Sequence, residues 1–504
     1  MKKIALIILI IVPLELMAQT LEFTDIKLNG TVNKKISSSL IENTNVELTG
    51  FTKNSDGFHK ATILFNGETE QIDLKRLDRI DFKPNSIKEF WQIKSLENEV
   101  YLNLIINGYQ FNLRKDLEEE AIEYLNQLIE SNLCLDDIFL ESYIYSLIYK
   151  IYPLNIEDGR PGFLNVKILK SSEPNAFIFP NGMLFISTGL ISTVNSEEEL
   201  ISVLAHEIAH FILDHSIINI NKATERQKRA EFWAAFATGL AAAADIYAST
   251  KNEYYNPGLL TMSTAYLSYS VASLINERMG VKYTKEQELI ADKCAVDLLK
   301  YININPLSLS SSLNKIKNYC IITGNYYAIS GSGTHPAIEE RIRNIGKPIQ
   351  FNNNNYDKII SFVNTYNAII EFNNNHLNAA LELAERNVKA NVATEDDYII
   401  LAMINLYLHD NEEQNIITYN YIDKAKSLNI NPNMNICKQE AIILLRLKKI
   451  TEAKQCLTEY NELLKSGLKD LDRIINQNEW LIYNRYYQNE IEWTSKMIYK
   501  INEL

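Results

Sequence analysis

The stretch Leu204–Ser216, LAHEIAHFILDHS, holds three of the seven histidines in this chain of 504 residues. Two of them enclose a glutamate in the order His206-Glu207-x-x-His210. Residues four apart lie one helical turn apart on one face, so both imidazoles can bind one ion. Glu207 can then reach a water beside that ion, as in the H-E-x-x-H sites of zinc hydrolases. The alternative is a helix with two histidines that are satisfied by core packing.

The residues around this motif predict a helix. Ser196 can accept a hydrogen bond at its start, and Glu199 three residues later completes a capping box. The acidic run before the motif suits the positive end of the helix dipole. Apolar residues recur at helical spacing: Leu200, Val203, Leu204, Ile208, Phe211 and Ile212. The motif therefore lies in the middle of a partly buried helix.

A zinc site needs a third protein ligand, and the nearby sequence offers a poor one. In the metzincin pattern, a glycine and then a third histidine follow the second histidine of the motif. That pattern is absent here, because Leu213 and Ser216 occupy those two positions. His215 lies five residues after His210, which turns it about 140° away from the ligand face. We predict that His215 packs beside the site or supports a ligand.

A second helix carries a better ligand in the sequence YTKEQELIADKCAVDLLKYI. Thr284 and Gln287 predict its capped start. Glu288 and Asp292 lie one turn apart, so one can bind the metal and the other can accept a hydrogen bond from a ligand imidazole. The alternative is a solvated acidic face. An apolar stripe makes that alternative weaker: Leu289, Val296 and Leu299.

A fourth histidine of interest, His335, precedes Pro336 and is therefore biased towards an extended backbone. It could stabilise an oxyanion, or occupy the open metal position and keep the site latent. An ordinary loop histidine is the alternative.

Two strands are predicted before the motif, over Asn175–Pro180 and Met183–Thr188. Asn181-Gly182 between them is a strong hairpin signal. Helical periodicity also covers residues 113–133 and 136–152.

The motifs HEIAH, ELIAD and THPAIEERI, preceded by NAFIFPNGMLFISTGLI, resemble the HtpX/BepA-like gluzincins of peptidase family M48. The resemblance covers about residues 116–347 and implies one zinc ion and peptide hydrolysis. It implies roles for seven residues: His206, His210 and Glu288 as zinc ligands, Glu207 as catalytic base, Asp292 as the orienting carboxylate, His335 as the regulatory or transition-state histidine, and Arg341 as a structural partner. It also implies that substrate pairs with an edge strand at Asn175, Ala176 and Phe177.

The N-terminal residues 1–18 are typical of a signal peptide, with Lys2 and Lys3 before an apolar stretch and Ala18 at the cut. We therefore expect an exported protein, periplasmic or secreted; an uncleaved anchor is the alternative. The five cysteines are widely spaced and contain no C-x-x-C, so a disulfide framework is not indicated.

Residues 19–115 predict a small β-rich module, because NVELTGF, KATILFNG, ETEQIDL and VYLNLIINGYQFNL are rich in strand-forming residues. Residues 230–249 and 258–280 predict packed helices, and membrane spans or shallow contact with a membrane surface are the alternatives. After residue 350, helical pairs starting near Tyr366, Tyr398 and Cys437 suggest tetratricopeptide-like repeats of about 34 residues. Irregular helical hairpins are the alternative.

The expected fold is α+β and mostly α, with a gluzincin metallopeptidase domain over residues 116–350 and helical repeats over 351–504. The net charge of −13 argues against a nucleic-acid partner. The favoured function is a zinc endopeptidase acting on misfolded or envelope polypeptides. The alternatives are a latent-site chaperone or assembly factor that binds envelope-protein clients through the repeats, and a membrane-bound protease.

Overall fold

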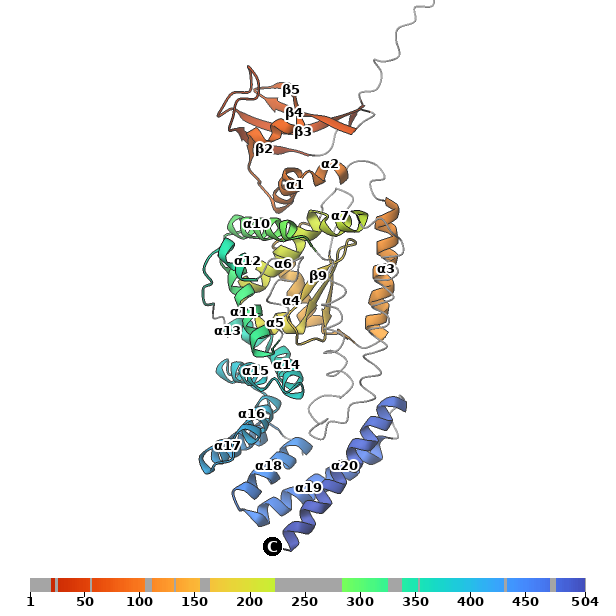
Figure 1. Cartoon of the computed structure of the whole chain (residues 1–504), viewed down its shortest axis with the longest axis vertical. Coiled ribbons are helices and arrows are strands. Elements are labelled where there is room, and N and C mark those ends of the chain that lie inside the picture. The colour runs from red at the N-terminus through yellow and green to blue at the C-terminus, as the bar shows by residue number, and fades with distance from the viewer. Residues whose placement is uncertain are drawn as a thin grey trace, which may run out of the picture. The chain divides into compact units, whose positions relative to one another are not determined.

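The computed structural model describes residues 20–22, 26–54, 57–104, 111–130, 133–154, 164–222, 283–324, 338–351, 354–429, 433–471 and 477–503 (Figure 1). The expected signal peptide, the two helices expected within 230–280 and His335 lie outside these residues. The chain divides into two compact units. The first is residues 1–116, 152–163 and 212–214, and the second is the remainder.

The first unit is built on a six-stranded antiparallel sheet of strand order β5-β4-β3-β2-β6, with β1 also paired to β3. Leu28, Leu48 and Ile63 are fully buried because they share the inner face of their strands. The elements are β1 (Thr20–Glu22), β2 (Leu28–Val32), β3 (Asn45–Asn54), β4 (Gly57–Phe65), β5 (Glu68–Asp73), the 3-10 helix η2 (Leu74–Arg79) and β6 (Ile80–Phe82).

In the described parts of VYLNLIINGYQFNL, residues 100–104 and 111–113, the expected strand is wrong. Helix α1 (Ile87–Glu97) follows the sheet, α2 covers Val100–Leu104, and α3 begins at Phe111. Val100 and Tyr101 are consecutive and both buried, and Tyr101 lies 6.2 Å from Phe51 of β3 between ring centroids. Strand propensity reflects packing on a pleated surface, and here packing of one helical face against the sheet overrides it.

The second unit contains a four-stranded sheet of order β7-β8-β10-β9. Its strands are β7 (Cys134–Leu135), β8 (Asn165–Leu169), β9 (Ala176–Ile178) and β10 (Met183–Ser187). β8 and β10 are parallel, and β9 pairs antiparallel to β10. The predicted hairpin is confirmed: Gly182 has a φ of 81°, and its amide donates to the Phe179 carbonyl at 2.9 Å. Among the described residues β9 is an edge strand.

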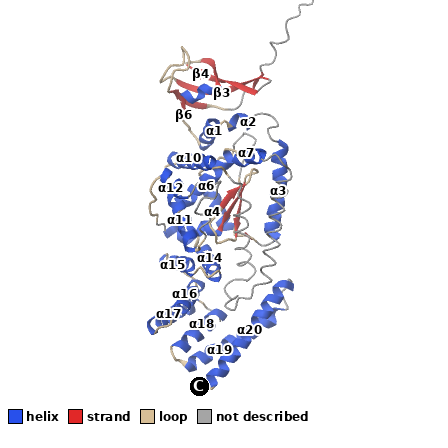
Figure 2. Cartoon of the chain, in the orientation of Figure 1, coloured by secondary structure: helices blue, strands red, loops and turns tan. Residues whose placement is uncertain are grey.

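Helices surround this sheet, and the unit is mostly helical (Figure 2). On one face, Tyr124 of α3 (Phe111–Glu130) packs edge-on against Phe179 and Phe185, each 5.6 Å away between centroids. The remaining helices of this part are α4 (Ile138–Ile148), α5 (Thr188–Thr193), α6 (Glu197–Ile212), α7 (His215–Lys222), α10 (Lys285–Tyr301), α11 (Ser308–Ile322) and α12 (Ile338–Ile345). None of the helices in the described ranges is long and apolar enough to cross a bilayer.

The C-terminal residues form α13 (Asn354–Ile359), α14 (Ser361–Asn373), α15 (Leu377–Lys389), α16 (Glu395–Leu408), α17 (Glu412–Leu428), α18 (Met434–Arg446), α19 (Ile450–Asp470) and α20 (Gln477–Asn502). α14 packs on α15, α16 on α17, and α18 on α19 (Figure 1). A small residue is fully buried in the second helix of each pair, at Ala380, Ala425 and Ala453. The described C-terminal residues therefore contain these three helical hairpins, while their tetratricopeptide character stays a prediction.

Candidate metal centre

Helix α6 begins where its local chemistry predicts. The Ser196 hydroxyl accepts from the Glu199 amide at 3.2 Å. The Glu199 carboxylate accepts from the Asn195 amide at 2.5 Å rather than from Ser196 itself. Two turns later His206 and His210 lie on the inner face and are 5% and 1% exposed.

Helix α10 brings the acidic pair to the same place. Both bonds of its predicted capping box are present: the Gln287 amide donates to Thr284 Oγ1 at 3.2 Å, and the Thr284 amide donates to Gln287 Oε1 at 2.8 Å. Glu288 and Asp292 are 3% and 4% exposed. The alternative of a solvated acidic face is therefore wrong.

Three side chains converge. His206 Nε2 lies 3.2 Å from His210 Nε2. Glu288 places Oε2 3.4 Å from His206 Nε2 and Oε1 3.8 Å from His210 Nε2. The ligand atoms of the three residues all lie within 4.8 Å of one another. Two imidazole nitrogens and one carboxylate oxygen are a donor set typical of catalytic zinc, so these residues fit that ion.

Asp292 orients His206. Its Oδ1 lies 2.9 Å from His206 Nδ1, so a proton on Nδ1 leaves Nε2 facing the other two ligands. Burial and Arg341 both act to lower the pKa of His206. Its hydrogen bonds to Asp292 and Glu288 outweigh them and raise that pKa to about 9. The carboxylates thus create a site that favours positive charge at His206.

His210 has a different support. Its Nδ1 lies 2.8 Å from Nδ1 of His215, which is 4% exposed. The Tyr283 ring stacks on His210 with centroids 3.6 Å apart and planes at 13°. Burial lowers the pKa of His210 well below its usual value, and burial lowers the pKa of His215 to about 4. Both imidazoles are therefore neutral near pH 7, and a single proton between them can fix the His210 tautomer.

Arg341, on α12, closes the acidic side of the cluster. Its Nε and Nη2 donate to the two Asp292 oxygens at 2.9 and 2.6 Å, and its Nη1 lies 3.3 Å from Glu288 Oε2. The Arg341 side chain is 13% exposed. Burial acts to raise the pKa of Asp292, but Arg341 and then His206 hold it below its usual range. The bidentate pair therefore keeps a buried carboxylate ionised.

The remaining expected site residues have different outcomes. Glu207 is partly exposed, unlike the buried residues beside it on α6. Its charge contributes to raising the pKa of both Tyr283 and Arg341, which places it near the cluster. Ala176 and Phe177 lie on β9, and Asn175 immediately precedes that strand. His335 lies outside the described residues.

Tyr283 is the residue that the sequence reasoning missed. It directly precedes the cap Thr284 of α10. A large apolar residue before a helix cap often packs against the first turns of that helix, and this is the one signal that could have found it. Its stacking on His210 depends on tertiary structure and has no local signature.

The sequence of this chain is similar to those of known metallopeptidases, as the cluster of possible zinc ligands leads one to expect. Residues 153–349 match the model of peptidase family M48. The chain is 29% identical over 117 residues to the mitochondrial metalloendopeptidase OMA1 of Bos taurus, covering 22% of this chain and 21% of that protein. It is 26% identical over 188 residues to the metalloprotease YcaL of Escherichia coli, covering 37% and 62%.

A third relative is the beta-barrel assembly-enhancing protease of Escherichia coli, 26% identical over 196 residues, covering 38% of this chain and 36% of that protein. Each match spans less than two thirds of the relative's own length. His206, His210, Glu288 and Arg341 all lie within the segment that the family model matches. Residues 153–349 therefore form a region that matches peptidase family M48 and is similar to known metalloproteases.

Proposed function

We propose that this protein is a zinc-dependent endopeptidase that hydrolyses peptide bonds of misfolded or envelope proteins after export to the periplasm or beyond. The convergence of His206, His210 and Glu288 beside the partly exposed Glu207 carries the proposal. The three ligands are buried, whereas the proposed base is accessible. A substrate and a water can reach such an arrangement from one side.

A bound zinc ion would supply Lewis acidity, which polarises a scissile carbonyl and lowers the pKa of a water. Glu207 then takes a proton from the attacking water and passes it to the leaving nitrogen. Asp292 and His215 hold the two imidazoles with Nε2 directed inward. Arg341 keeps the Asp292 carboxylate charged and lies 3.3 Å from Glu288 Oε2.

Strand β9 is the proposed binding edge for an extended substrate. The carbonyl of Asn175 and the amide of Phe179 are both hydrogen bonded to β10, at 2.9 Å each. Along an antiparallel strand, residues alternate between pointing their backbone groups to one neighbour and to the other. Ala176 and Ile178 therefore turn their amides and carbonyls away from β10. We propose that substrate pairs there, which moves the expected contacts from Asn175 and Phe177 to these two residues.

Metal removal tests the proposal. We expect the purified full-length chain to cut an unfolded protein, a chelator to abolish cutting, and added Zn²⁺ to restore it, because the water needs the ion to ionise near neutral pH. Fragments are followed by mass spectrometry. Cutting that continues in the chelator, or no cutting by protein shown to contain one zinc per chain, would contradict the proposal.

His215→Phe tests the support of His210. Phenylalanine keeps a buried aromatic ring but removes the nitrogen that lies 2.8 Å from His210 Nδ1. Loss of an outer partner of a metal ligand typically costs about 10- to 100-fold in metal affinity, and we expect a loss of that size here. Competition titration with a zinc chelator measures it. His409→Phe, at an exposed position in the C-terminal helices, is the control and should bind zinc as the parent does.

A second candidate function is client binding by the C-terminal helices, with the metal site latent, as in a chaperone or assembly factor. Exposed apolar side chains at the end of α16 and the start of α17 favour it: Tyr407 (61%), Leu408 (48%) and Ile416 (51%). In that case the assay above would give an unfolded client that stays soluble and uncut.

A further inference from the structure

Helix α5 connects the two parts of the proposed active site. β10, the partner of the edge strand β9, ends at Ser187, and α5 begins at the next residue. Three residues separate the end of α5 from Glu197, where α6 begins, and α6 carries His206 and His210. A shift of α5 therefore reaches both the substrate edge and the metal-binding helix.

The C-terminal helices hold α5 through buried polar bonds. Asn367 of α14 accepts from Thr188 Oγ1 at 2.9 Å and donates to Ser192 Oγ at 2.7 Å. All three residues are less than 5% exposed. Tyr356 of α13 donates its hydroxyl to the Ile191 carbonyl at 2.6 Å. These hydrogen bonds are buried, so breaking one leaves a polar group without a partner and costs free energy. Each bond therefore restrains α5.

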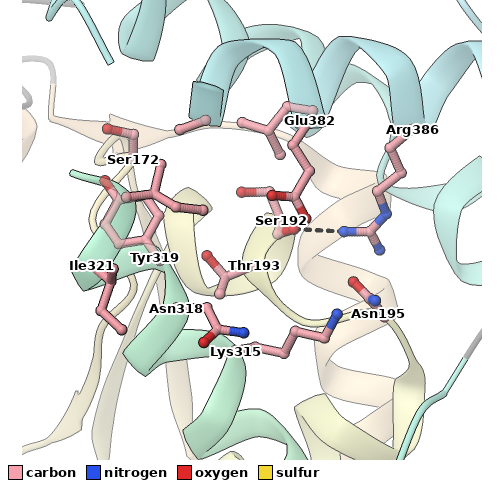
Figure 3. Close-up of a pocket in the computed structure, with 13 residues that line it drawn as sticks. Ser172, Ser192, Thr193, Asn195, Lys315, Asn318, Tyr319, Ile321, Glu382 and Arg386 are labelled. Carbon is pink, nitrogen blue, oxygen red and sulfur yellow. Dashed lines mark hydrogen bonds between the residues drawn. The ribbon is translucent and has the colours of Figure 1, made fainter. Parts of the chain in front are cut away.

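Arg386 of α15 completes this contact at the C-terminal end of α5 (Figure 3). Its Nη1 donates to the Ser192 carbonyl at 2.6 Å and its Nη2 to the Val194 carbonyl at 2.9 Å. Its Nε donates to Asp357 at 2.6 Å, which fixes the guanidinium plane. The last carbonyls of a helix have no partner within the helix, and a cation there also suits the helix dipole.

The segment that follows β8 packs closely against α5. The Gly189 amide donates to the Ser171 carbonyl at 2.6 Å. A Cβ on Gly189 would lie 2.1 Å from the Ser172 carbonyl oxygen, so only glycine permits this approach. α5 is therefore held by the segment that follows β8 and by the C-terminal helices together.

We infer that α13–α15 are a positioning element of the peptidase, in which Asn367 and Arg386 set the place of α5 and, through it, of β10 and α6. Neither residue belongs to the metal centre. The expected loss of peptide cleavage rests on the proposed function, whereas the expected change in the hydrogen exchange of α5 and α6 does not.

A cavity of about 270 Å³ adjoins the contact, between α5, α11 and α15 (Figure 3). Arg386, Lys315 and Glu382 line it. When Arg386 is shortened, water can therefore enter and solvate the two carbonyls. The variant is expected to fold, yet to hold α5 less firmly.

The chain offers a matched control. Arg446 of α18 donates Nη1 to the His409 carbonyl at 2.7 Å and Nη2 to the Leu406 carbonyl at 2.9 Å. It therefore caps the end of α16 as Arg386 caps α5, but entirely within the C-terminal helices. Arg386→Gln and Arg446→Gln remove the same kind of bond at two places.

Hydrogen–deuterium exchange of the full-length protein, read by mass spectrometry, tests the inference. In Arg386→Gln we expect amides within residues 188–212 to exchange roughly tenfold faster or more, while α18 and α19 exchange as in the parent. Arg446→Gln should leave residues 188–212 unchanged. Peptide cleavage by Arg386→Gln should fall in kcat with zinc still bound.

Three results would overturn the inference: unchanged exchange over 188–212 in Arg386→Gln, an equal rise in Arg446→Gln, or a uniform rise over the whole chain. If Arg386→Gln does not fold, Asn367→Ala replaces it. Its control is Asn405→Ala, since Asn405 donates to the Gln414 carbonyl at 2.9 Å and to Thr418 Oγ1 at 2.8 Å within the C-terminal helices. A parent that does not cleave would contradict the proposed function and leave the exchange comparison intact.

Discussion

Glu207→Gln is expected to lower kcat/KM for an unfolded substrate by roughly 10²- to 10⁴-fold, which is the usual contribution of a positioned general base. Glutamine has nearly the same shape but cannot take a proton. The ligand set consists of His206, His210 and Glu288, so zinc content and melting temperature should match the parent. Cleavage kinetics, metal analysis and thermal unfolding on one preparation measure all three.

Glu198→Gln is the control for that variant. Glu198 lies in the first turn of the same helix and is also partly exposed. The Glu198→Gln variant removes one negative charge from α6, as Glu207→Gln does, and it should cleave the substrate as the parent does. Activity of Glu207→Gln within a few-fold of the control would mean that another group takes the proton.

Arg341→Met is expected to lower the free energy of unfolding of the metal-free protein by about 3–5 kcal/mol, because it leaves a buried charge without its partner. Asp292 would lose two donors, and Glu288 would lose its nearest cation. Methionine preserves most of the buried apolar stem. Urea unfolding in the presence of a chelator measures the change without the added stability of bound metal.

Arg343→Met separates this effect from a general loss of charge on α12. Arg343 lies on the same short helix and is exposed. Its replacement should change the free energy of unfolding by about 0.5 kcal/mol or less. Equal losses in both variants would show that the guanidinium of Arg341 does not stabilise the buried carboxylates.

The helices that carry the candidate site were predictable from sequence because their signals are local. Ser196 and Thr284 predicted the starts of α6 and α10, which begin one residue later. Helix caps depend on side-chain oxygens and backbone amides two or three residues away, so no tertiary information is needed. The shared face of His206 and His210 follows from the helical repeat in the same way.

The contacts between these helices were not predictable from spacing. The bidentate pair of Arg341 with Asp292 joins residues 49 apart, and the stacking of Tyr283 on His210 joins the residue before the cap of α10 to α6. The role of Arg341 came from the family resemblance. The spacing of Glu288 and Asp292 allowed either one to be the ligand, and the resemblance assigned the orienting role to Asp292. The strand expected at residues 100–104 and 111–113 is wrong for a related reason, since propensity does not say which surface a segment will pack on.

The link between α5 and the C-terminal helices also had no local signal. Thr188 and Asn367 are 179 residues apart, and neither belongs to a recognisable motif. A boundary near residue 350 follows from composition and repeat length alone. Both sides of that boundary belong to one compact unit.

The contact of Arg386 with α5 depends on the side chain of only one of its two partners. The carbonyls of Ser192 and Val194 belong to the backbone, so no substitution on α5 removes them as acceptors. A single change at position 386 leaves both without their donor. A substitution within α16–α20 leaves this contact in place, whereas a substitution in the first helical hairpin, α14–α15, can remove it.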